Sequence, residues 1–283
     1  MRLMNAFLSN RARRAAAIIA CVLCVAWLAT QLPPFAGASL QQHCVGCNQH
    51  DGLSVVVINY DRPHNLARLL PALSSYAIVD EIVVAHCHPD HYTPLAVNKT
   101  VHLELYDLDK ELGAGLRTLI PFTYSRVLYV DDDLLPSADT IAKLLALQDA
   151  HGEVGLYGLK RYWRVCQPLI GYTLVPSWAY YLAYPLINTI LTPVLLTSKR
   201  FITAFNDHFD QLYRAKLRAT HGNGEDLCIN HFLRAHFHLL PRHVAVPEQD
   251  VAALDHKNGY SFKPGHSNVR RELCRWLYWQ PGN

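Results

Sequence analysis

Short hydrophobic runs recur along the first half of the chain and predict the strands of a sheet. LSVVVIN (53–59), EIVVAH (81–86) and RVLYV (126–130) contain few polar residues and many Val and Ile residues, which is typical of buried strands. VHLELYD (101–107) alternates apolar and polar positions, which indicates a strand with one polar face.

Helical spacing appears between these runs. Leucines recur at intervals of three and four residues over 66–73, with Asn65 as the expected N-cap. We expect a helical stretch at about 109–122, and ADTIAKLLALQ (138–148) follows Ser137, a typical N-cap residue. This alternation predicts an α/β fold in which helices cover an open, mainly parallel sheet.

The N-terminus carries a long uncharged segment, AAAIIACVLCVAWLATQL (15–32), directly after Arg13 and Arg14. A helix of this length rises roughly 27 Å, close to the thickness of a thin bilayer. The preceding arginines predict a cytoplasmic N-terminus. The chain then divides into a cytoplasmic tail (1–14), a transmembrane signal anchor (15–32), a stem (33–51) and a lumenal domain (52–283). A cleaved signal peptide ending at 36–38 is the alternative.

Charge adds little to this picture once its position is considered. The formal net charge is +3, from 26 basic and 23 acidic residues. Four arginines precede Asp51, the first acidic residue, so 22 basic residues face 23 acidic ones in the rest of the chain. Nucleic-acid binding needs a clustered basic face, and the sequence therefore predicts no nucleic-acid partner.

Other features agree with a lumenal domain, and hence with a single-pass type II protein of the endoplasmic reticulum or Golgi membrane. Asn98-Lys99-Thr100 is an N-glycosylation sequon, which predicts a glycan on Asn98. An even number of cysteines follows the anchor, in a compartment that permits disulfides. These are Cys44, Cys47, Cys87, Cys166, Cys228 and Cys274.

An acidic triplet, Asp131-Asp132-Asp133, follows the apolar strand at 126–130. Ligand sites in open α/β sheets form at the carboxyl ends of strands. Adjacent carboxylates repel one another, and a hard cation such as Mn²⁺ or Mg²⁺ can offset this and bridge to a diphosphate. The sequence thus predicts a metal site, with a solvated turn as the alternative.

A second acidic pair, Glu225-Asp226, follows the glycines of Gly222-Asn-Gly224 and precedes a helical pattern. The glycines would let the loop approach a ligand closely while the carboxylates point out of it. Simple stabilisation of a helix N-terminus by acidic residues is the alternative.

Five segments, in order, resemble the exostosin-type glycosyltransferases, whose catalytic domain is glycosyltransferase family 64. They are Val55–His86, Arg126–Gln148, Leu195–Phe205, Gly224–Arg234 and Lys257–Ser261. The resemblance implies a GT-A fold (an open mixed sheet), a metal-dependent reaction that retains configuration, and a nucleotide-sugar donor, usually a UDP-sugar of the UDP-GlcNAc or UDP-GalNAc kind.

The resemblance also assigns roles to individual residues. Asp133 corresponds to the direct metal ligand, and Glu225-Asp226 to the catalytic acids near the anomeric carbon. It implies, by analogy, a Cys228–Cys274 disulfide. Donor-binding roles fall on Tyr60, Arg62, Arg117, Asp131, Asp132 and His266.

The segment 166–198 contains no charged residue and no histidine, and it corresponds to the acceptor side of the family's cleft. We expect Trp178, Tyr180 and Tyr181 to stack on acceptor sugars or to lie at the membrane interface. An ordinary core with a buried strand near Pro193–Leu196 is the alternative.

These inferences together favour a glycosyltransferase with a glycan or lipid-linked acceptor. Two other functions stay open. One is a catalytically degenerate family member that assembles with an active glycosyltransferase, and the other is a metal-dependent phosphohydrolase or nucleotidyltransferase. The expected partners include a homo- or hetero-oligomer with other glycosyltransferases.

Overall fold

The computed structural model describes residues 52–59, 62–87, 95–104, 112–167, 171–174, 188–255 and 265–278. Within these ranges no helix has both the length and the apolar character to span a bilayer. The expected tail (1–14), anchor (15–32) and stem (33–51) lie outside the described residues, and their assignment stays a prediction.

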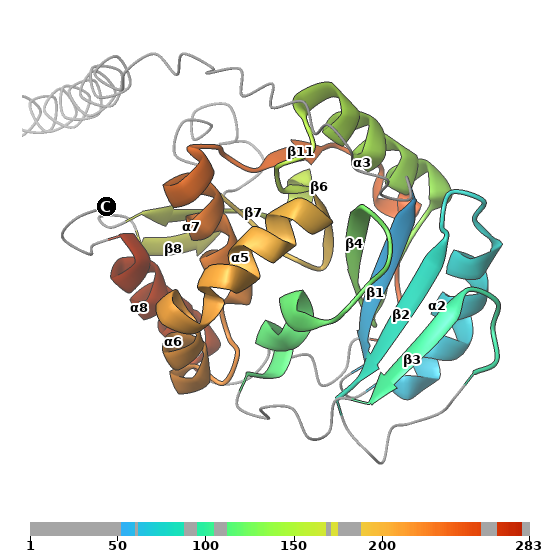
Figure 1. Ribbon diagram of the computed structural model, residues 1–283, viewed down its shortest axis with the longest axis horizontal. Helices are drawn as coiled ribbons and strands as arrows, with labels where there is room; N and C mark the ends of the chain where they lie inside the picture. The colour runs from blue at the N-terminus through green and yellow to red at the C-terminus, as the bar shows by residue number, and fades with distance from the viewer. Residues whose placement is uncertain are drawn as a thin grey trace, which may run out of the picture. The chain divides into compact units, whose positions relative to one another are not determined.

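A seven-stranded sheet forms the centre of the described region (Figure 1). Its order is β11 (Arg242–Val244), β6 (Tyr157–Leu159), β10 (Val194–Ser198), β4 (Arg126–Asp131), β1 (Leu53–Asn59), β2 (Glu81–His86) and β3 (Thr100–Glu104). The four strands from β4 to β3 are parallel, and β10 is antiparallel to both of its neighbours. The expected mainly parallel α/β sheet is therefore confirmed.

Two small sheets flank the large one. The first pairs β12 (Val251–Ala253) with β5 (Leu134–Pro136). The second has the order β8 (Gly171–Leu174), β7 (Trp163–Gln167) and β9 (Thr189–Ile190). Buried β9 and β10 confirm the core strand expected near Pro193, whereas Trp178, Tyr180 and Tyr181 lie outside the described residues.

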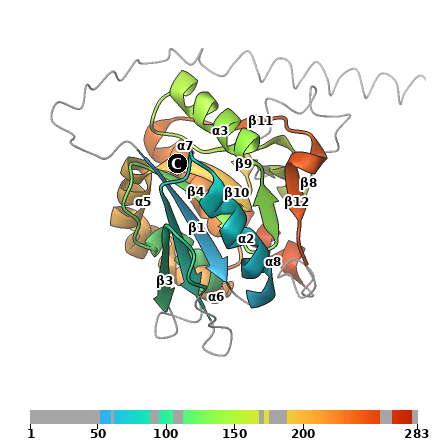
Figure 2. The same cartoon turned by 90° about the vertical axis from the view of Figure 1, so that its right-hand side faces the viewer.

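Helices cover both faces of the large sheet, and Figure 2 shows α2 (Pro63–Ser75) and α5 (Lys199–Leu212) on opposite sides of β1. Leucines of α2 and α3 (Ala138–His151) pack against Val55 and Val57, while Phe205 of α5 belongs to the cluster on the other face, with Val56. This alternation follows from the period of two in a strand. The other helices within the described ranges are α6 (Arg214–Ala219), α7 (Glu225–Phe237), α8 (His266–Tyr278), and the 3₁₀ turns η2 (Gly113–Leu119), η3 (Lys160–Tyr162) and η6 (Glu248–Asp250).

Helix starts test the capping predictions. Ser137 caps α3 as expected, accepting a hydrogen bond from Thr140 N at 3.1 Å. The prediction for Asn65 is wrong, because α2 begins at Pro63, whose fixed φ and missing N–H suit a first helical turn. Asn65 lies inside the helix, where its Nδ2 donates to Asp255 O at 2.8 Å. The helix expected at 109–122 is a shorter 3₁₀ turn, η2, within the described residues.

Candidate functional site

The acidic triplet lies where the strand order of the parallel half reverses. Strand β1 pairs with β2 on one side and with β4 on the other, so the chain turns back across β1. Asp131 is the last residue of β4, and Arg62 follows the carboxyl end of β1. Such a reversal leaves a crevice at the carboxyl ends of the strands, which is the usual ligand position in open α/β sheets.

Arg62 binds two carboxylates of the triplet. Its Nη2 lies 2.5 Å from Asp132 Oδ1, and its Nη1 lies 2.7 Å from Asp133 Oδ2. Burial raises the pKa of Asp132 to about 6, although Arg62 opposes the shift. Burial and the charge of Asp131 also raise the pKa of Asp133. The carboxylates repel one another as expected, and in this structure an arginine offsets part of that repulsion.

Arg117 of η2 binds the third carboxylate from a buried position. Its Nη2 donates to Asp131 Oδ1 at 2.6 Å and its Nη1 donates to Thr192 O at 2.7 Å. Burial lowers the pKa of Arg117, but the charges of Asp131 and Glu225 outweigh it and raise the pKa overall. Arg117 is therefore a fixed cation beside the triplet.

Thr192 connects the triplet to the second acidic pair. Its backbone oxygen accepts from Arg117, and its Oγ1 donates to Glu225 Oε1 at 3.0 Å. Glu225 is buried at the start of α7, and burial together with the charge of Asp226 raises its pKa. The structure thus brings together two acidic groups that lie more than 90 positions apart in the sequence, because Thr192 binds both Arg117, the partner of Asp131, and Glu225.

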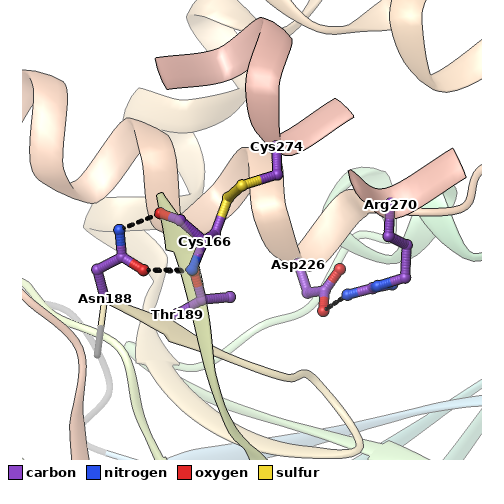
Figure 3. The surroundings of a disulfide bond; sticks show 6 residues. All are labelled: Cys166, Asn188, Thr189, Asp226, Arg270 and Cys274. Carbon is purple, nitrogen blue, oxygen red and sulfur yellow. Dashed lines mark hydrogen bonds and ion pairs between the residues drawn. A yellow bond between two sulfur atoms is a disulfide. The ribbon is translucent and has the colours of Figure 1, made fainter. Parts of the chain in front are cut away.

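Asp226 forms a buried ion pair with Arg270 of α8 (Figure 3). The guanidinium of Arg270 also donates to Asn223 Oδ1 at 3.2 Å and lies 4.6 Å from the ring centroid of Tyr172. Asp226 Oδ1, which is buried, has no hydrogen-bond partner within the described residues. A buried carboxylate oxygen without a donor is costly, and a catalytic role or a bound water or ion is among the explanations for one.

Sequence reasoning missed Arg270. The only available signal was its spacing with Leu273, Cys274 and Leu277, which places a charged residue on the buried face of α8. A buried arginine requires a partner, but the sequence alone did not show which acid it would meet.

The disulfide differs from the expected one. Cys166 of β7 bonds Cys274 of α8, with a Cα–Cα distance of 5.6 Å, and the expected Cys228–Cys274 pairing is wrong. Cys228 is a free thiol buried in the core on α7. The backbone of Cys166 is held by both polar atoms of the Asn188 side chain, at 2.9 and 2.5 Å (Figure 3). Both β7, which carries Cys166, and α7, which carries Cys228, lie against α8, and of these two cysteines it is Cys166 that bonds Cys274.

The other expected site residues fall in different places. His266 begins α8, and its carbonyl accepts from Asn223 Nδ2 at 3.2 Å, so it lies beside the Asp226 cluster. Burial and then Arg270 lower the pKa of His266. Asn98 is exposed in the turn before β3, where a glycan has space. Tyr60 lies outside the described residues.

The chemistry of the triplet fits a hard divalent cation that shares its ligands with a substrate. The ion pairs of Asp131 with Arg117 and of Asp133 with Arg62 each use one oxygen of the carboxylate. Mg²⁺ commonly binds one or two carboxylates and completes its shell with water and phosphate oxygens. Within the described residues no group of three or more acidic, histidine or cysteine side chains forms a ready-made cage. The triplet thus offers carboxylate oxygens of the kind that Mg²⁺ binds, without a complete set of protein ligands among the described residues.

A chain of hydrogen bonds through two histidines, which we call the histidine chain, links β1, β2 and β3. His102 Nε2 lies 3.2 Å from Leu95 O, which can only accept, so His102 Nδ1 accepts from His86 Nε2 at 2.9 Å. His86 Nδ1 then accepts from Asn59 Nδ2 at 3.0 Å. The chain fixes the tautomers of both rings and the orientation of the Asn59 amide at the end of β1. Burial and His102 lower the pKa of His86 to about 4, so it is neutral at neutral pH.

No protein-family model matches the chain, and no curated protein matches its sequence. The exostosin-type resemblance therefore gains no support from these comparisons. A solved structure with a related arrangement is 4-diphosphocytidyl-2C-methyl-D-erythritol synthase from Anaerococcus prevotii DSM 20548. The two are 11% identical, and the match covers 79% of this chain and 98% of that chain with a TM-score of 0.47. So distant a likeness says nothing about this chain's chemistry.

Proposed function

We propose that the chain is a nucleotide-sugar-dependent glycosyltransferase with a GT-A arrangement, which moves a sugar from a UDP-sugar to a glycan or lipid-linked acceptor. The observation that carries this proposal is the junction of two acidic groups at the strand-order reversal. The buried Arg117 donates to Asp131 and interacts electrostatically with Glu225, and Asp226 follows Glu225 directly.

The triplet with its bound arginines and the Glu225-Asp226 pair suit opposite ends of a sugar–diphosphate bond. When that bond breaks, negative charge grows on the departing phosphate and positive charge on the anomeric carbon. Arg62 and Arg117 are cations beside the triplet and suit the phosphate end. Asp226 carries a buried carboxylate oxygen with no donor in the described region and suits the carbon end.

The overall exchange balances without a redox partner. The bond between the anomeric carbon and the phosphate oxygen breaks, and the acceptor oxygen forms the new bond to that carbon. The acceptor's proton leaves with the nucleoside diphosphate. A divalent cation held by Asp133, when bound, would neutralise the diphosphate. Arg62 would exchange one of its carboxylate partners for a phosphate oxygen, since guanidinium groups bind both bidentately.

A second function is favoured by one observation. Arginines already bind all three carboxylates of the triplet, which is the arrangement expected if this site has become structural. The chain would then be a catalytically degenerate partner of an active glycosyltransferase. A donor-binding experiment separates the two functions.

The test is titration calorimetry of the full-length chain with UDP, with GDP as comparison, in the presence and absence of Mn²⁺. We expect Mn²⁺-dependent binding of UDP that Asp133→Asn weakens at least tenfold, or about 1.4 kcal/mol. Asp139→Asn, an exposed carboxylate in the first turn of α3, is the matched control and should bind as the wild type does. Absence of nucleotide binding by the wild type would contradict the transferase and favour the assembly partner.

A further inference from the structure

A shallow, open cavity of about 530 Å³ is lined in part by Leu134, the residue that follows the acidic triplet in the sequence. Its walls come from the small β12–β5 sheet and from η3 and η6, and they include Leu134, Arg161, Tyr162, Glu248, Gln249 and Ala252. The volume falls in the range of roughly 300–1,000 Å³ typical of small-molecule sites.

The cavity is connected to the triplet through the backbone. Leu134, in its wall, follows Asp133 in the sequence, and Leu254 N donates to Asp133 O at 2.7 Å. Ala253 pairs with Leu134 across the small sheet. Burial raises the pKa of Tyr162, and the charges of Asp131 and Asp133 raise it further, so this phenol lies within electrostatic range of the triplet. A molecule in the cavity would therefore lie next to the expected donor position.

The wall combines hydrogen-bonding and apolar surfaces. Arg161 forms no ion pair within the described residues. Its guanidinium lies 5.1 Å from the ring centroid of Tyr162, hydrogen-bonds the Tyr162 side chain and makes a long 3.5 Å contact to Val251 O. Glu248 and Gln249 are exposed at the opening and supply a carboxylate and an amide. The Tyr162 ring and the side chain of Ala252 add apolar contact area.

We propose that this cavity is the acceptor site and that it binds a neutral sugar unit of a glycan. Arginine and the glutamine amide can donate to sugar hydroxyls, the Glu248 carboxylate can accept from them, and an aromatic ring can pack against the apolar C–H face of the sugar. The charges of Arg161 and Glu248 in the wall nearly cancel, which disfavours a polyanion such as a second nucleotide. The inference rests on the proposed function, since it names the substrate class of that same site.

The test measures sugar binding and nucleotide binding on the same protein. The full-length chain in detergent is mixed with a panel of p-nitrophenyl hexopyranosides and N-acetylhexosaminides in the presence of UDP and Mn²⁺, and saturation transfer to the sugar protons is recorded by NMR. Ala252→Trp would fill the cavity from an exposed strand position, while Ala215→Trp places the same side chain on the exposed surface of α6.

We expect saturation transfer to at least one sugar with the wild type and Ala215→Trp, and its loss with Ala252→Trp, while UDP binds all three proteins. Arg161→Met should weaken sugar binding about tenfold more than it weakens UDP binding. A general loss of folding would instead weaken both to the same extent. Equal sugar signals from Ala252→Trp and the wild type would overturn the acceptor site. UDP binding without any sugar signal would also overturn it and leave the proposed function standing. Failure of UDP to bind would reject both.

Discussion

Arg270 of α8 and Asp226 of α7 form a buried ion pair, and Arg270 lies four residues before Cys274, which the disulfide ties to β7. One face of α8 thus carries both the partner of the expected catalytic acid and the covalent link that holds the helix in place.

Removing the guanidinium should be severely destabilising. Arg270→Met keeps much of the side-chain volume but leaves Asp226 as an unpaired buried charge, a change that typically costs about 3–5 kcal/mol. The measurement is the free energy of unfolding in urea. The neighbouring Arg271→Met is the control, because Arg271 is exposed and its loss should cost within about 0.5 kcal/mol. Equal losses of unfolding free energy in both variants would mean that the buried ion pair contributes no more to stability than an exposed arginine does.

The disulfide should stabilise the domain through the 108-residue separation that it closes. The chain-entropy argument gives about 4.7 kcal/mol for a loop of roughly 100 residues. We expect dithiothreitol to lower the melting temperature of the wild type and of Cys228→Ala, and to have a much smaller effect on the Cys166→Ala/Cys274→Ala variant. Peptide mapping without reduction should recover Cys166 joined to Cys274. Recovery of Cys228 joined to Cys274 instead would contradict the observed pairing.

Gly224 should resist substitution for two separable reasons. Its φ is +120°, and a Cβ there would lie 2.3 Å from Leu273 Cδ2. Gly224→Ala is expected to cost about 1–3 kcal/mol of unfolding free energy and to displace the first turn of α7, which carries Asp226. Gly152→Ala is the matched control, because Gly152 has φ +105° with no atom near its Cβ position. A cost no larger than that of Gly152→Ala would rule out the contact with Leu273.

The sequence predicted the strands around the triplet better than the contacts within the site. Runs such as 53–59 and 126–130 are apolar throughout, and burial on both faces of a parallel sheet requires that pattern. The position of Asp131 at the carboxyl edge of the sheet followed directly from its place at the end of the apolar strand. In contrast, the partners of Asp226 and Cys274 are set by how β7, α7 and α8 pack, which joins segments far apart in sequence and leaves no local pattern. The Asn65 cap failed because Pro63 is the stronger helix-start signal.

The histidine chain makes stability depend on pH. Folding lowers the pKa of His86 from 6.5 to about 4, so the unfolded chain binds more protons between these values. Stability should therefore fall as the pH is lowered from about 6.5 towards 4, and this contribution should level off below that. Chemical denaturation between pH 7 and pH 4 measures the change. His86→Gln, which does not titrate, should show a shallower decline than the wild type. An unchanged slope would show that His86 is not a source of the pH dependence.

The central claim is that the two acidic groups form one sugar-transfer site. The most direct measurement is the rate of UDP release from a panel of UDP-sugars by the full-length chain with Mn²⁺, compared between the wild type, Asp133→Asn, Asp226→Asn and the exposed control Asp139→Asn. We predict turnover of at least one UDP-sugar by the wild type and the control, and a loss on the order of 10²-fold or more in each site variant. UDP binding with no release from any sugar, or release that both site variants retain in full, would contradict the account.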